Sequence, residues 1–155
     1  MFENDSLTTL DSIGEFGLID RIKGSVKIYN TETITGIGDD GAILDSKGLC
    51  TVVSTDMLVE GVHFDMHYTP IKHLGYKAVV VNLSDIAAMN GLPKQITVSL
   101  AISSKYTLEA IEELYTGMNA ACKNYNIDLI GGDTTTIQTG LVISVSALGY
   151  AHKED

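Results

Sequence analysis

The sequence predicts an α+β domain, in which a mostly antiparallel or mixed sheet carries helices packed on one face. Residues 95–102 alternate strictly between large apolar and small side chains, which is typical of a strand with one face on a core. Segment 70–89 has a strongly apolar middle and predicts a buried helix. Segment 107–126 carries an apolar stripe at helical spacing. Strands and helices of these kinds bury their apolar sides by stacking in layers.

The N-terminal third is expected to hold a short amphipathic helix followed by a strand pair. The capping box Ser12–Glu15 predicts a helix over 12–24. Strands 42–44 and 49–53 follow, joined by four turn-forming residues. The helix has no group that points to chemistry, so docking against the domain is the simpler interpretation.

Helix caps and alternation define the remaining elements. Thr69 and Pro70 are a favourable helix start, and Asn90 followed by glycine is a favourable stop. Thr107 is expected to cap the next helix, and Asn126 to end it. The predicted elements are, in chain order, a helix over 70–89, a strand over 95–102, a helix over 107–126, and strands over 127–130 and 141–150.

The composition predicts one globular domain that binds neither nucleic acid nor membrane. The chain has 155 residues, 45% of them hydrophobic, and a formal net charge of -10, which opposes association with nucleic acid or anionic lipid. No apolar run reaches membrane-spanning length, and the acidic start does not resemble a secretory leader, so we expect a cytoplasmic protein. Arg21 is the only arginine, so a phosphate ligand would need another source of positive charge.

Aspartates recur where the pattern should be apolar or where an element should end. Asp39 and Asp40 lie between glycines in the run 36–41, Asp56 follows a strand and two hydroxyls, and Asp133 follows two glycines. Carboxylates are rarely buried unless paired or bound to a cation, and oxygen ligands suit Mg²⁺. We therefore expect these side chains to converge on divalent metal that holds phosphate. Taken singly, each also fits a solvated turn or a cap.

Asp85 lies inside the apolar helix predicted over 70–89. It follows Asn82 by three residues, so the two side chains share one face of the helix. A buried carboxylate without a partner is costly, and no cationic residue is stacked beside it. Metal coordination would offset that cost. A buried hydrogen-bond network that uses Asn82 and Ser84 is the alternative.

Two further features can contact a ligand directly. Gly131 and Gly132 would let backbone N–H groups approach a phosphate while Asp133 holds a bridging cation. The spacing is neither that of a P-loop nor that of a Rossmann fingerprint, and a hairpin turn is the alternative. His63, in the short connector 59–64, either donates a hydrogen bond to an anionic ligand or is a solvated loop residue.

Five segments follow one another in order over nearly the whole chain: GEFGLID from Gly14, GIGDDGA from Gly36, STDMLVEGVHF from Ser54, KAVVVNLSDIAAMNGLP from Lys77 and IGGDTT from Ile130. Together they resemble the thiamine-monophosphate kinase family. The wider superfamily, which includes aminoimidazole ribonucleotide synthetase and selenophosphate synthetase, shares the glycine–aspartate theme. The VEGVHF and NLSDIAAM stretches are more similar to the kinase.

The resemblance implies ATP-dependent, Mg²⁺-assisted phosphorylation of thiamine monophosphate to thiamine diphosphate, for which we name no general base. It implies a substrate contact at His63 and nucleotide contacts at Tyr115, Gly132 and Asp133. Asp39 is not expected to be a direct ligand. The metal ligands that it implies are Asp40, Ser54, Thr55, Asp56, Asp85 and Asp133.

Members of this family are longer and carry a second domain. The resemblance therefore identifies residues 1–155 as a single N-terminal domain for ATP and Mg²⁺ binding and for dimerisation, without the family's C-terminal domain. It implies a homodimer in which sheets join through the small-residue face of strand 95–102, and a fragment that does not turn over alone. The alternatives are a related superfamily enzyme acting on another phosphate acceptor, and a non-catalytic module that binds nucleotide or dimerises.

Overall fold

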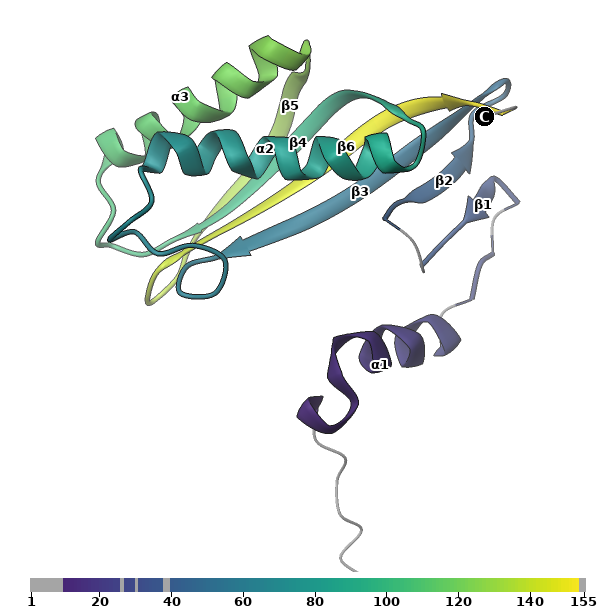
Figure 1. Ribbon diagram of the computed structural model, residues 1–155, viewed down its shortest axis with the longest axis horizontal. Coiled ribbons are helices and arrows are strands. Elements are labelled where there is room, and N and C mark those ends of the chain that lie inside the picture. Colours follow the sequence, from purple (N-terminus) through teal and green to yellow (C-terminus); the bar gives the residue numbers. More distant parts are fainter. Residues whose placement is uncertain (1–9, 26, 30, 38–39, 154–155) are drawn as a thin grey trace, which may run out of the picture.

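The computed structural model describes residues 10–25, 27–29, 31–37 and 40–153, and within these ranges it shows a six-stranded sheet with two helices on one face (Figure 1). The predicted α+β class is confirmed. The elements are α1 (Leu10–Ser25), β1 (Thr33–Thr35), β2 (Ala42–Asp45), β3 (Leu49–Val59), α2 (Ile71–Ala88), β4 (Leu92–Ile102), α3 (Leu108–Tyr125), β5 (Asp128–Thr136) and β6 (Leu141–His152).

The sheet has the strand order β1-β2-β3-β6-β4-β5. The last strand of the chain, β6, lies between β3 and β4 and is antiparallel to both. Strands β4 and β5 are parallel, and α3 makes the crossover that a parallel connection requires. Three edges are therefore open among the described residues: the outer side of β1, the outer side of β5, and the outer side of β3 beyond Val53, where the pairing with β2 stops.

The core lies between the sheet and α2 with α3. Inward residues of β3, β4 and β6 alternate with outward ones, as the strand period of two requires. Each large aliphatic side chain that is fully buried contributes about 1.5–3 kcal/mol. No described helix is both long and apolar enough to cross a membrane. The largest fully buried side chains are Leu74, Ile86, Ile96, Leu114, Met118, Leu141, Ile143, Val52, Val79, Val98, Val145 and Asn82.

Two glycines let α2 and α3 touch along their backbones. A Cβ at Gly75 would lie 2.0 Å from the carbonyl oxygen of Leu114, and a Cβ at Gly117 would lie 1.8 Å from that of Lys72. No larger residue fits at either position without moving a helix. The contact fixes α2 on the sheet and, with it, the side chains that α2 carries toward β3.

The predicted helix ends are correct for α3 and partly wrong for α2. The hydroxyl of Thr107 accepts a hydrogen bond of 3.2 Å from the backbone nitrogen of Ala110, and Asn126 adopts the left-handed conformation that ends the helix. At the start of α2, Pro70 occupies the cap position and no side chain caps the helix, so the predicted role of Thr69 is wrong. Asn90 is left-handed with φ 55°, as its predicted stop requires.

All the predicted strands extend beyond their predicted bounds, and β3 and β5 extend furthest. Strand β3 continues through Ser54 and Asp56, because its pairing with β6 extends to Val59. Strand β5 continues through the two glycines to Thr136, because parallel pairing with β4 extends that far and β-branched threonines favour strands. The hairpin turn considered for residues 131–136 is therefore wrong.

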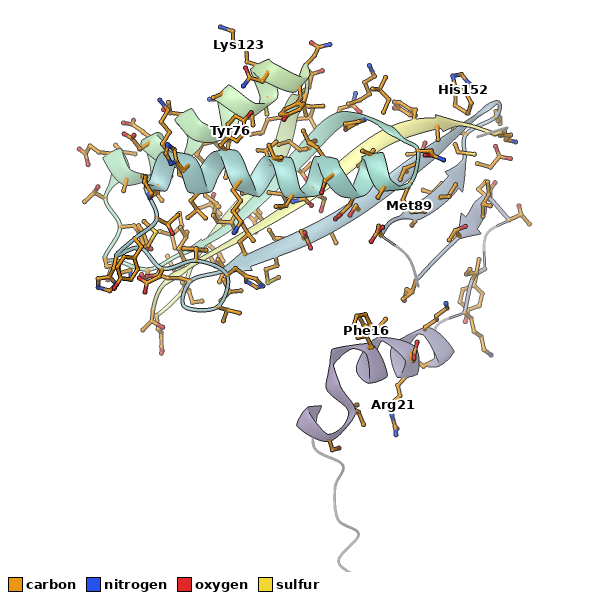
Figure 2. All side chains as sticks on the ribbon, in the orientation of Figure 1. Phe16, Arg21, Tyr76, Met89, Lys123 and His152 are labelled. Carbon is orange, nitrogen blue, oxygen red and sulfur yellow. The ribbon has the colours of Figure 1, made fainter. Side chains whose placement is uncertain are left out.

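Helix α1 differs from the prediction at both ends. The described helix already includes Leu10, so Ser12 lies inside it rather than at its cap, and the helix continues past Gly24 to Ser25. In Figure 1 this helix lies apart from the sheet. Phe16 is 82% exposed on the side facing the sheet, and Arg21 lies on the opposite side (Figure 2). Close docking of this helix was expected and is not observed.

Candidate active site

A hydrogen bond joins β3 to α2 at the centre of the predicted metal site. The hydroxyl of Ser54 donates to Oδ2 of Asp85 over 3.0 Å. Ser54 is 6% exposed and shares the helix-covered face of β3 with Val52, because alternate residues of a strand point the same way. Asp85 is half-buried on α2. The sheet and the helix thus place the hydroxyl and the carboxylate together.

Negative charge accumulates around Asp85. Burial raises the pKa of this carboxyl above its ordinary value, and the nearby carboxylates of Asp56 and Asp40 raise it further, while the hydrogen bond from Ser54 opposes the rise. Three of the predicted ligands therefore lie close enough to feel one another's charge. A cation among them would relieve both the repulsion and the burial cost.

Asn82 adds an unsatisfied oxygen one helical turn before Asp85. Its Nδ2 donates to the carbonyl oxygen of Ala78 over 3.0 Å, which fixes the orientation of the amide. The side-chain oxygen Oδ1 is buried and has no hydrogen-bond partner within the described part of the chain. A buried acceptor without a partner costs about 1–3 kcal/mol. A buried acceptor without a described partner therefore lies one helical turn before Asp85.

A depression of about 790 Å³ opens at the free edge of β3. Asp40, Ser54 and Thr55 line it on the strand side, and α1 borders it with Phe16 and Lys23. Because the ladder with β2 ends at this point, side chains from both faces of the sheet reach the opening. The run 36–41 contributes Asp40, whereas Asp39 lies outside the described residues.

The acidic side chains do not form a closed metal site by themselves. Among the described residues, no group of three or more His, Cys, Asp or Glu side chains lies close enough to hold an ion. The carboxylates are nevertheless near enough to shift the pKa of Asp85. The arrangement is an open, negatively charged site in which the hydroxyl of Ser54 donates a hydrogen bond to Asp85.

Thr55 and Asp133 lie on the face of the sheet that carries no helix. The hydroxyl of Thr55 accepts a hydrogen bond of 3.0 Å from Ser146 and donates to the carbonyl oxygen of Val145. Asp133 is exposed on β5 and pairs with Ser99. Strands β6 and β4 separate β5 from β3, so three spacings of about 4.8 Å lie between them. Within one chain Asp133 does not join Asp85.

Gly132 has a packing role in the strand where it lies. A Cβ at this position would lie 1.7 Å from the carbonyl oxygen of Val98, so only glycine permits the pairing of β5 with β4. Gly131, by contrast, has open space where a Cβ would be added. Of the two glycines, only Gly132 is required by the packing of β5 against β4.

The other two predicted contacts lie elsewhere on the domain. Tyr115 is half-buried on α3 against the core, and burial raises the pKa of its hydroxyl. His63 is exposed in the loop after β3, where its Nδ1 lies 2.9 Å from the backbone nitrogen of Val59. The structure does not gather these two side chains with Asp85.

A network at the base of this loop was not predicted. Tyr106 donates a hydrogen bond of 2.6 Å to the carboxylate of Glu60, and Lys105 forms an ion pair with the same carboxylate. These partners are 45 and 46 residues apart in the chain, and no local pattern links them. The contact forms because the loop after β3 and the loop after β4 lie together in the folded chain.

Comparisons with known proteins place the chain in a family. Residues 38–151 match the family model described as AIR synthase related protein, N-terminal domain. The chain is 46% identical over 140 residues to the thiamine-monophosphate kinase of Bacillus subtilis. The matched region covers 90% of this chain and 43% of that relative. The chain belongs to the family of AIR synthase related proteins, N-terminal domain. The thiamine-monophosphate kinase of Aquifex aeolicus is 36% identical over 144 residues.

Solved structures are also similar to this chain. The structure of AaThiL complexed with AMPPCP and TMP matches with a TM-score of 0.85 and 34% identity, covering 96% of this chain and 45% of that one. A structure of the HypE–HypF complex, at 19% identity and a TM-score of 0.65, shares the fold alone. The chain spans less than half the length of the thiamine-monophosphate kinases described above.

Proposed function

We propose that this chain is the nucleotide- and Mg²⁺-binding half of a thiamine-monophosphate kinase, which phosphorylates thiamine monophosphate to thiamine diphosphate with ATP in the cytoplasm. The observation that supports it most directly is the Asp85 carboxylate, held by Ser54 beside Asp40 and Asp56. Negative charge gathered in this way suits a cation that binds phosphate. The related AaThiL structure was complexed with AMPPCP and TMP.

In this proposal Asp40, Asp56 and Asp85 hold Mg²⁺ as carboxylate ligands, and Ser54 orients Asp85. Bound Mg²⁺ would neutralise the charge of the nucleotide phosphates. Because the described acidic groups are too dispersed to enclose an ion alone, water and phosphate oxygens would complete its shell. Thr55 joins the set from the free edge of β3, where it lines the same depression.

Tyr115, Gly132 and Asp133 are proposed to contact the nucleotide, with Asp133 also serving as a metal ligand. Asp133 lies on the face opposite the helices and three strands from β3 in the same chain. We therefore place its contribution in a homodimer, in which a second copy brings β5 to the site. A monomeric site would leave Asp133 without this role.

The helix-free face of the sheet is the proposed dimer surface. It carries small polar side chains, among them Thr55, Thr97, Ser99 and Ser146, that let a second sheet approach closely. Size-exclusion chromatography with light scattering tests the dimer, and a clean monomer at micromolar concentration contradicts it. Asp133→Asn should then weaken Mg²⁺-nucleotide binding without changing the oligomeric state.

The 155-residue chain is proposed to bind Mg²⁺-nucleotide and not to turn over alone, because it spans under half of its relatives. Calorimetric titration with Mg²⁺ and AMPPCP tests binding, with Asp56→Asn and Asp85→Asn expected to abolish it. Turnover is tested in a chimera that joins this chain to the C-terminal half of the Bacillus subtilis relative. Formation of thiamine diphosphate by the unfused chain would contradict the proposal that it does not turn over alone.

The same chimera separates the remaining candidates. Phosphorylation of a different phosphate acceptor, with thiamine monophosphate ignored, would favour a related enzyme of the superfamily. Unchanged turnover in the Asp56→Asn and Asp85→Asn chimeras would favour a non-catalytic module for nucleotide binding or dimerisation. We expect thiamine monophosphate as acceptor and loss of turnover in both variants.

A further inference from the structure

Helix α1 lines the depression at the free edge of β3 with one of its faces. Its contribution consists of Phe16, Ile19, Asp20 and Lys23. Their spacing of three and four residues places these side chains on the same side of a helix. On the strand side, the lining includes the candidate ligands Asp40, Ser54 and Thr55. The helix and the strand edge thus border one space of about 790 Å³.

Lys23 is the only positively charged side chain among the described residues that line this depression. Two carboxylates, those of Asp20 and Asp40, line it as well, so the charge of Lys23 lies among negative groups. Lys23 is exposed, and its ammonium group ends a long flexible side chain. The ammonium group can therefore follow a ligand that enters between α1 and β3.

Arg21 belongs to another face of the same helix. It lies on the side of α1 that is turned away from the sheet, whereas Phe16 faces the sheet (Figure 2). Arg21 is exposed and does not line the depression. Two cationic residues thus lie two positions apart on α1, and only Lys23 is directed to the candidate active site.

A phosphate held in this depression would need a positive charge in addition to Mg²⁺. Nucleotide phosphates carry several negative charges, and the lining adds the carboxylates of Asp20 and Asp40. Mg²⁺ is coordinated by only some of the phosphate oxygens, and protein donors contact others. Lysine is a common partner of phosphate, to which it presents a compact point charge.

A second depression, of about 610 Å³, shares Lys23 with the first. Lys27 lines this second space, together with the apolar side chains of Ile28 and Ile34. None of the candidate metal ligands is among the described residues that line it. A substitution at Lys27 therefore changes the charge of the neighbouring space and not that of the candidate active site.

We propose that Lys23 is a further binding residue of the candidate active site, and that its ammonium group donates a hydrogen bond to a phosphate oxygen of a substrate bound between α1 and β3. This inference rests on the proposed function, which brings phosphate to that place. The phosphate belongs either to ATP or to thiamine monophosphate, and both offer the same kind of oxygen.

Calorimetric titration of the 155-residue chain tests this contact. Lys23→Gln should weaken binding of AMPPCP with Mg²⁺, or of thiamine monophosphate, about five- to tenfold, the effect of one charged hydrogen bond near the surface. Lys23→Arg should recover most of the affinity, because a guanidinium group also donates to phosphate. A loss confined to AMPPCP assigns the contact to the nucleotide, and a loss confined to thiamine monophosphate assigns it to the acceptor.

Arg21→Gln and Lys27→Gln are the matched controls, because each removes one positive charge that lies outside the depression. Both should leave the two affinities unchanged. An equal loss in Lys27→Gln would place the ligand in the neighbouring space, and an equal loss in all three variants would indicate a general charge effect. Either result overturns the proposal.

A purely structural role of Lys23 is the remaining alternative, because a cation in the last turn of a helix also stabilises that helix. In that case Lys23→Gln would lower the Tm of the ligand-free chain and leave both affinities intact, which overturns the contact. The rise in Tm that Mg²⁺ produces should persist in Lys23→Gln, since Lys23 contacts phosphate and not the metal. Loss of that rise would also contradict the proposal.

The same titrations separate this proposal from the proposed function. If the parent chain and the chimera bind neither AMPPCP nor thiamine monophosphate, the proposed function falls, and the phosphate contact of Lys23 falls with it. If both bind and Lys23→Gln binds equally well, the contact alone is overturned and the proposed function stands.

Discussion

The hydroxyl of Ser54 donates a 3.0 Å hydrogen bond to Oδ2 of Asp85 and so connects the strand and the helix that carry the candidate ligands. The bond favours the ionised carboxylate, whereas burial and the charges of Asp56 and Asp40 disfavour it. Because the pKa of Asp85 is raised overall, the metal-free site opposes ionisation, and a cation would reverse that preference.

Asp85→Asn should stabilise the metal-free chain. The pKa of Asp85 is raised above 3.8 in the folded chain, so the unfolded chain releases this proton first and stability falls as pH rises through that range. Asparagine keeps an acceptor for Ser54 and removes the charge. We expect the Tm at neutral pH to rise by about 2–4 °C, and Mg²⁺ to stabilise the parent but not the variant.

Thermal unfolding with and without Mg²⁺, from acid to neutral pH, checks this prediction. Asp128→Asn, which removes an exposed carboxylate on β5, is the control and should leave the Mg²⁺ response unchanged. A variant at Asp85 that is less stable than the parent at neutral pH would contradict the account of its burial.

Gly132→Ala should detach or distort β5. The added Cβ would lie 1.7 Å from the carbonyl oxygen of Val98, and strand separation is the only relief. We expect a loss of at least about 2–3 kcal/mol in the free energy of unfolding. Gly131→Ala is the matched control, because nothing lies within 4 Å of its added Cβ. Urea unfolding of both variants measures the difference, and equal effects would refute it.

Two substitutions of similar size at Asn82 should change stability by very different amounts. Leucine removes the unsatisfied Oδ1, so Asn82→Leu is expected to change the free energy of unfolding by no more than about 1 kcal/mol. Aspartate adds a buried charge beside Asp85, so Asn82→Asp should cost about 3 kcal/mol without metal. Chemical denaturation of the two variants tests this, and a severe loss in the leucine variant would mean that Oδ1 has a partner.

Glu60 should contribute to acid unfolding. Burial raises the pKa of its carboxyl, but hydrogen bonds from Lys105 and Tyr106 outweigh this and lower the pKa below 4.5. Its contribution to stability is thus present above that value and is lost as pH falls through the folded pKa. Glu60→Gln should flatten the acid limb of the stability profile. Glu113→Gln, exposed on α3, is the control, and identical profiles would contradict the prediction.

Local patterns predicted the layers and most of the elements. Alternation over 95–102 and the caps of α3 at Thr107 and Asn126 agree with the structure, because each depends on neighbours in the chain. The length of β3 and β5 was underestimated, since strand length there depends on partners far along the chain. The expected docking of α1 against the domain is also wrong, because an apolar stripe does not specify the surface that would cover it.

The expected convergence of the candidate ligands is confirmed only in part. Ser54 and Asp85 meet as expected, with Asp40 and Asp56 close by. Asp133 lies three strands from β3, a fact that only the strand order reveals. The contacts of Glu60 and of Nδ1 in His63 leave no trace in a local pattern, because they are made by loops that meet only in the folded chain.

Strand β3 is paired along its whole length with β6, from Leu49 opposite His152 to Val59 opposite Val142. A ribosome must therefore synthesise nearly all of the chain before the strand that carries Ser54 and Asp56 gains its partner. Until then an apolar strand and the buried face of α2 remain uncovered on the nascent polypeptide. Such long-range pairing slows folding and lengthens exposure to aggregation and chaperones, so the surface that carries Ser54 and Asp56 is among the last parts of the molecule to form.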